Sequence, residues 1–151
     1  MLFTSLAAAA ALATTPDCRL ISFSRSPALA RTSEEVCVRR AGTAEEFALR
    51  RTSTDARGVS SESSTSTGKC KGVLEQLRAL EALKLPQVDL PAFGKEVQVI
   101  TMDGAGYRLT APALYDGAMS QLVVQSNVGT PLARWVDETL RALAPCWREA
   151  R

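Results

Sequence analysis

The regular spacing of apolar residues is confined to the second half of this chain, and this asymmetry most constrains how the chain can fold. Between Thr130 and Pro145, apolar side chains recur at intervals of three and four residues, as on one face of a helix. Thr130 suits the cap of this helix, Pro131 its first turn and Pro145 its end. A similar stripe after Lys69, ending before Pro86, predicts a second helix. The two stripes consist of Val73, Leu74, Leu77 and Leu80, and of Leu132, Trp135, Val136, Thr139, Leu140 and Leu143.

The segment between these helices has the pattern of strands. β-Branched residues at every second position predict a strand over 95–102, and residues 107–111 form its hairpin partner after a turn at 103–106. Residues 119–128 predict a third strand. We therefore expect a compact α+β domain over residues 69–151, in which a small three-stranded antiparallel sheet is flanked by two helices.

The preceding region lacks such regularity. Residues 52–67 contain ten Ser or Thr in sixteen positions, with Val59 as the one large apolar side chain. Such a segment buries too little apolar surface to offset the entropy of ordering its backbone. We expect residues 34–68 to form a disordered Ser/Thr-rich linker, with a short helix over 43–51 that starts from the capping-box pair Thr43 and Glu46. The N-terminal half is thus predicted to be largely disordered.

Residues 1–33 have the composition of a targeting peptide. Three arginines against one acidic residue, among many Ser, Thr and Ala, favour import into a mitochondrion or plastid. The alternative is the secretory pathway, because Leu2–Leu12 is apolar and Ala11–Ala13 has the small-x-small cleavage pattern, although no basic residue precedes it. An apolar run of about a dozen residues is too short for an integral membrane helix, which needs about 20.

Composition excludes several chemistries. The chain contains no histidine, which removes Ser-His and Cys-His nucleophiles and every imidazole metal ligand. A net charge of +2 gives no electrostatic support for nucleic-acid binding. The four cysteines lack C-x-x-C spacing, so they predict no metal site, and we expect isolated thiols or small buried apolar residues. The alternative is a disulfide between Cys70 and Cys146, which would form only in an oxidising compartment. Since no nucleotide motif is complete either, we predict no catalytic, cofactor or metal site, and an enzyme is the least favoured class.

Three aromatic residues are the candidates for ligand or partner contacts, namely Tyr107, Tyr115 and Trp147. The favoured hypothesis is a non-catalytic subunit or accessory interaction factor of an organellar assembly, with a protein partner. The alternative is a small binding domain that holds an apolar or lipid-like ligand between sheet and helices, with Tyr107 and Tyr115 near the mouth. The sequence does not specify the oligomeric state.

Overall fold

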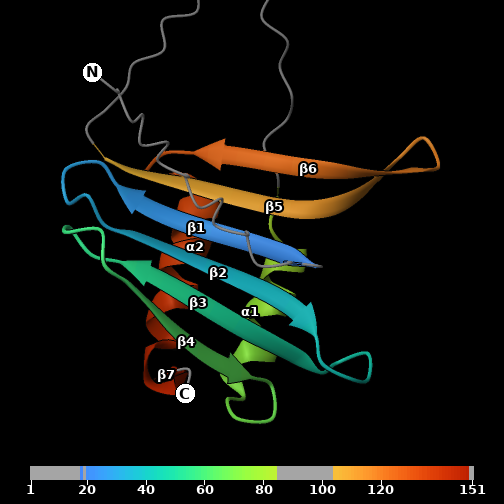
Figure 1. Cartoon of the computed structure of the whole chain (residues 1–151). Coiled ribbons are helices and arrows are strands. Elements are labelled where there is room, and N and C mark those ends of the chain that lie inside the picture. The colour runs from blue at the N-terminus through green and yellow to red at the C-terminus, as the bar shows by residue number, and fades with distance from the viewer. Residues whose placement is uncertain (1–17, 19, 85–103, 150–151) are drawn as a thin grey trace, which may run out of the picture.

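The computed structural model describes residues 18, 20–84 and 104–149. Within these residues a single seven-stranded antiparallel sheet carries two helices on one of its faces (Figure 1). The elements, in chain order, are β1 Ile21–Pro27, β2 Ser33–Arg40, β3 Phe47–Thr54, β4 Ser60–Ser66, α1 Gly72–Glu81, β5 Ala105–Tyr115, β6 Ala118–Ser126, α2 Pro131–Ala142, a 3₁₀ turn Ala144–Cys146, and β7 Arg148–Glu149. None of the described helices is long and apolar enough to cross a membrane.

The strand order is β6-β5-β1-β2-β3-β4-β7, so the first strand of the chain lies in the middle of the sheet. β1 pairs with β2 on one side and with β5 on the other, with Phe23 opposite both Val36 and Leu109. Strands β1 to β4 form a meander, and β5 then returns to the free side of β1. The sheet is therefore completed only when the C-terminal half of the chain joins the N-terminal half.

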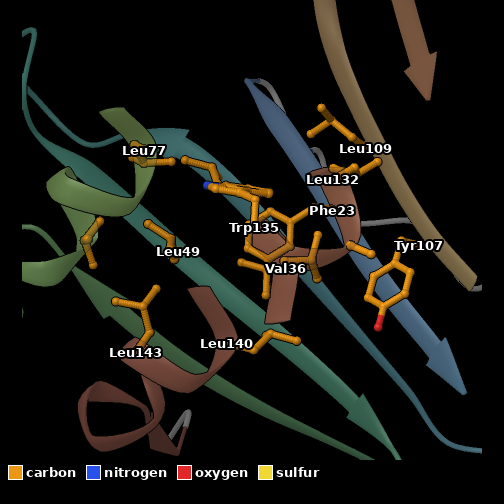
Figure 2. Close-up of a cluster of buried hydrophobic side chains, with 14 of the residues drawn as sticks. Phe23, Val36, Leu49, Leu77, Tyr107, Leu109, Leu132, Trp135, Leu140 and Leu143 are labelled. Atoms are coloured by element: carbon orange, nitrogen blue, oxygen red, sulfur yellow. The ribbon is translucent and has the colours of Figure 1, made fainter. Parts of the chain in front are cut away.

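Alternation of side chains explains how these strands build a core. In β2 and β3, Val36, Val38 and Leu49 face the helices and are at most 2% exposed, while the intervening residues face the opposite side. We call these two sides the helix face and the outer face. Figure 2 shows Trp135 of α2 at the centre of the buried cluster, where its ring meets Phe23 edge to face at 4.8 Å between centroids.

The two helices are joined to each other by polar contacts as well as by packing. The indole Nε1 of Trp135 donates a hydrogen bond to the backbone carbonyl of Gln76 at 3.0 Å. The hydroxyl of Thr139, which is 2% exposed, bonds to the side-chain oxygen of the same Gln76 at 3.1 Å. These bonds satisfy groups that would otherwise be costly to bury, so they help to define how α1 sits beside α2.

Two disulfides connect distant parts of the chain. Cys18 is bonded to Cys37 of β2, with their Cα atoms 5.1 Å apart. Cys70, just before α1, is bonded to Cys146, with their Cα atoms 5.8 Å apart. Both separations lie in the usual range for disulfides, and the described residues include no free cysteine.

The predicted fold is correct in class and wrong in extent. The α+β class is confirmed, but the sheet has seven strands instead of three. Residues 21–66, which were predicted to be largely disordered, are ordered: they supply β1 to β4, and Phe23, Val36 and Leu49 lie in the same core as Trp135. Polar residues on the outer face hide this pattern in the sequence, because only every second side chain of such a strand is apolar.

The predicted short helix over 43–51 is also wrong. Residues from Phe47 onward form β3. The turn before it is closed by two hydrogen bonds: the Thr43 amide donates to the side-chain carboxylate of Glu46, and the Glu46 amide donates to the Thr43 carbonyl. The Ser/Thr-rich segment forms the end of β3 and all of β4, whose Ser63 and Thr65 are buried on the helix face. Pairing with β3 provides hydrogen-bond partners for backbone N–H and C=O groups of β4. This segment is therefore ordered within the sheet although it has few apolar side chains.

Both predicted helices are confirmed. α2 starts at Pro131 with the side chain of Thr130 accepting a hydrogen bond from the Ala133 amide at 3.1 Å. The predicted third strand corresponds to β6. The expected strand over 95–102 lies outside the described residues, and the expected turn over 103–106 is replaced at Ala105 by the start of β5.

Candidate functional site

An apolar pocket lies between the C-terminal part of α1 and the helix face of the sheet. Its volume is about 370 Å³, which is within the size range of small-molecule sites. Leu77, Leu80 and Leu83 form one wall, and residues from β1, β3, β5 and β6 form the other. The complete lining consists of Leu20, Ile21, Arg40, Phe47, Leu77, Leu80, Glu81, Leu83, Leu109, Ala111, Pro112 and Leu122.

The local structure explains why a space remains here. The stripe of α1 continues past its buried residues Val73 and Leu77 to Leu80 and Leu83, which are only half-buried although they contact the core. On the sheet side, Ala111 offers a small side chain opposite Leu122 of β6. Pro112 has no N–H to donate, and the pairing of β5 with β1 ends just before it at Thr110. Small side chains and the end of the pairing together leave the pocket open.

Two charged residues are part of the lining. Arg40 ends β2 and Glu81 ends α1, and both are exposed to solvent. Neither takes part in an ion pair among the described residues. The pocket therefore combines an apolar interior with one cation and one anion at solvent-accessible positions.

Tyr107 is buried and does not line this pocket. Its hydroxyl donates a hydrogen bond of 2.9 Å to Asp137 of α2, and the other oxygen of that carboxylate lies 3.3 Å from Nε of Arg25. Burial raises the pKa of Tyr107, and the hydrogen bond to the Asp137 carboxylate raises that pKa further. The contacts fasten β5 and β1 to α2, so Tyr107 acts as a structural residue in this arrangement.

Trp147 lies at the other end of the sheet. It is 8% exposed, and the guanidinium of Arg51 sits 4.9 Å from the centre of its ring. Arg51 also bonds to Ser63 at 3.1 Å and pairs with Glu34 at 3.5 Å, which holds it over the indole. Trp147, a candidate for ligand or partner contact, is packed within its own chain in this arrangement.

The three aromatic candidates are therefore not brought together. Tyr115 ends β5 opposite Ala118, and its side chain is outside the described part of the structure. Neither Tyr107 nor Trp147 lines the apolar pocket. The sequence did not identify the residues of this pocket, because half of its sheet wall, namely Leu20, Ile21, Arg40 and Phe47, comes from the N-terminal region that was predicted to be disordered. The half-buried apolar residues Leu80 of α1 and Leu83 just after it were a signal for it.

One further cluster has the composition of a metal site. The ligand atoms of Cys18, Glu35 and Cys37 lie within 4.8 Å of one another. The two sulfurs are bonded to each other, and a disulfide sulfur is not the thiolate that binds a metal. The cluster as it stands is a disulfide beside an exposed carboxylate.

No family model, no curated protein and no solved structure matches this chain.

Proposed function

We propose that this protein binds a fatty acid, with the acyl chain in the pocket between α1 and the sheet. The observation that carries the proposal is the lining itself, in which apolar residues predominate around a space of about 370 Å³. Removing an acyl chain from water into such a lining is favourable in proportion to the apolar area buried. The proposal develops the apolar-ligand hypothesis, but it places the ligand beside α1 and away from Tyr107.

The charged residues of the pocket suggest how the ligand would be oriented. A carboxylate at the solvent end of the chain would find Arg40, whose planar guanidinium binds carboxylates through two parallel hydrogen bonds. Glu81 would oppose the same charge. We expect Arg40 to contribute more than Glu81 subtracts, because a direct hydrogen-bonded contact outweighs a solvent-screened repulsion.

A matched pair of variants tests the acyl-chain site. Ala111→Trp places a large ring in the pocket, whereas Thr110→Trp places the same ring on the outer face one residue earlier in β5. Displacement of a fluorescent polyene fatty acid by decanoate measures binding. We expect a loss of at least about tenfold in affinity for Ala111→Trp and little change for Thr110→Trp. Equal affinities in the two variants, or no binding to the unmodified chain, would refute the proposal.

A second pair tests the orientation. Arg40→Ala should weaken binding of decanoate several-fold while leaving the uncharged decanol unaffected, and Glu81→Gln should slightly strengthen decanoate binding. If Arg40→Ala weakens both ligands equally, the guanidinium contributes through its apolar stem and not through its charge.

We also infer that the chain resides in an oxidising compartment, and that residues before Cys18 act as the targeting peptide that directs it there. Two observations support this. All four cysteines are paired, which is usual outside the reducing cytosol. β1 begins at Ile21 in the middle of the sheet, so removal of all of residues 1–33 would delete a central strand. Cleavage after Ala13 would leave every described residue in place.

The N-terminus of the protein recovered from cells tests this location. We expect it to lie between Thr14 and Cys18, with no thiol available to an alkylating reagent until the protein is reduced. Recovery of an N-terminus beyond Ile21, or of four reactive thiols, would contradict the inference. Identification of the compartment by fractionation separates an organelle from the secretory pathway.

A further inference from the structure

Among the described residues, β6 is an edge strand that lacks the features which usually block edge pairing. Within the described residues it is hydrogen-bonded to β5 alone. Its nine residues include no charged side chain and no proline, the two devices that most often block edge pairing. The opposite edge differs, because β4 carries Glu62 and is partly covered by β7. In the described sheet, one edge is therefore partly covered by β7, and the other, at β6, has no strand beside it.

The turn before β6 determines which of its backbone groups point outward. Asp116 and Gly117 both have positive φ, at 48° and 76°, as in the two-residue type I′ turn of a hairpin. The residues that flank such a turn, Tyr115 and Ala118, form a hydrogen-bonded pair, and the pattern alternates from there. It follows that Met119, Gln121, Val123 and Gln125 direct their N–H and C=O groups away from β5.

The sequence of β6 is nearly symmetric about Val123. It reads Ser-Gln-Leu-Val-Val-Gln-Ser over residues 120–126, with serines at both ends, glutamines next to them, and Leu122 and Val124 beside the centre. In an antiparallel pair of two such strands, each residue would lie opposite one of its own kind. The residue on the two-fold axis would be Val123, whose backbone groups already point outward.

Exposed apolar residues gather at the same place. Of the six large hydrophobic side chains that are exposed in the described part of the chain, four belong to the β5–β6 hairpin or the loop that follows it. These are Leu114 at 72%, Met119 at 75%, Val123 at 40% and Val128 at 45%. An antiparallel partner centred on Val123 would bring its own Met119 beside Asn127, next to Val128. A concentration of exposed apolar side chains on one hairpin is expected at an interface.

We propose that two copies of this chain pair through β6 in antiparallel orientation, with Val123 of each copy on the two-fold axis. Gln121 of one copy then lies opposite Gln125 of the other, and about six backbone hydrogen bonds join the strands. The two sheets become one continuous sheet with all helices on the same face. An isologous contact of this type closes on itself and produces a dimer and not a filament. The proposal is independent of ligand binding.

A charge at the axis tests the dimer. Val123→Lys places two ammonium groups opposite each other, whereas Thr110→Lys adds the same charge on the outer face of β5, directly opposite Val123 within the hairpin. Sedimentation velocity across a concentration series should show a dimer for the unmodified chain and for Thr110→Lys, and at least about a tenfold weaker association for Val123→Lys. An unmodified chain that remains monomeric at high micromolar concentration overturns the proposal, as does equal weakening by both variants.

Cross-linking tests the register and does not depend on the charged variant folding. In a glutathione redox buffer, Val123→Cys should form a covalent dimer, because residues in a hydrogen-bonded pair have Cα atoms about 5.5 Å apart. Gln125→Cys should not, since residue 125 lies opposite residue 121 of the second copy. A covalent dimer of Gln125→Cys without one of Val123→Cys would overturn the assignment of the axis.

Discussion

Strands β1 to β3, which the helices cover, and the turn end of the β5–β6 hairpin, which they do not cover, contain similar apolar residues that differ in exposure. In β1 to β3, apolar side chains such as Phe23 and Leu49 lie under α1 and α2 and are 2% exposed. Toward the hairpin turn, Leu114 and Met119 are more than two thirds exposed, because β5 and β6 continue beyond the strands and helices that would cover them. The difference shows that a second layer, and not the type of strand residue, decides which apolar side chains of this sheet are buried.

The largest expected effect concerns the disulfide within the covered part. The Cys70–Cys146 bond closes a sequence separation of 76 residues, against 19 for Cys18–Cys37. Chain-entropy estimates give about 4 kcal/mol for the longer loop and about 3 kcal/mol for the shorter one. Urea unfolding of the two double Cys→Ser variants should reproduce this order. The reverse order would mean that strain or residual unfolded-state structure outweighs loop length.

Replacing one leucine by alanine in each of these two regions tests whether burial under the helices decides its contribution to stability. Leu49→Ala removes a side chain that is 2% exposed and should lower the free energy of unfolding by about 3 kcal/mol. Leu114→Ala makes the same chemical change at a side chain that is 72% exposed and should alter it by less than about 0.5 kcal/mol. Thermal and urea unfolding at low protein concentration provide the measurement. A comparable loss in both variants would mean that the hairpin end is also covered in solution.

A smaller effect than that of Leu49→Ala is expected at Tyr107, which is also buried. Tyr107→Phe removes the hydrogen bond to Asp137 and should cost about 1 to 2 kcal/mol at neutral pH. The folded state holds the Tyr107 proton more tightly than the unfolded state, since burial and Asp137 raise its pKa above 10.0. Stability from this group is therefore complete below pH 10 and is lost as the pH rises through the folded pKa.

Unfolding measured between pH 8 and pH 11 checks the sign of this dependence. The unmodified chain should lose stability more steeply at alkaline pH than the Tyr107→Phe variant does. Parallel slopes for the two proteins would show that Tyr107 does not titrate differently in the folded state.

Local patterns were sufficient for part of this fold. α2 could be predicted almost to its ends, because the cap at Thr130, the proline at position 131 and the apolar stripe all lie within the helix itself. β6 could be recognised for the same reason, from its own alternation and the glycine after it. The apolar pocket could not, since Ile21, Phe47 and Leu109 come from three strands and approach one another only in the completed sheet.

By itself, then, the sequence determined the two helices and their buried faces, because a helix closes its hydrogen bonds over four residues. That residues 21–66 are ordered follows only from the tertiary structure. The hydrogen-bond partners of the β1 to β4 backbone lie on other strands, and no local sequence pattern identifies those strands. The tertiary structure also decided that Trp147 is enclosed and that β6 pairs, among the described residues, with β5 alone. Strand pairing is a non-local contact, and its physical consequences appear only when the whole sheet is assembled.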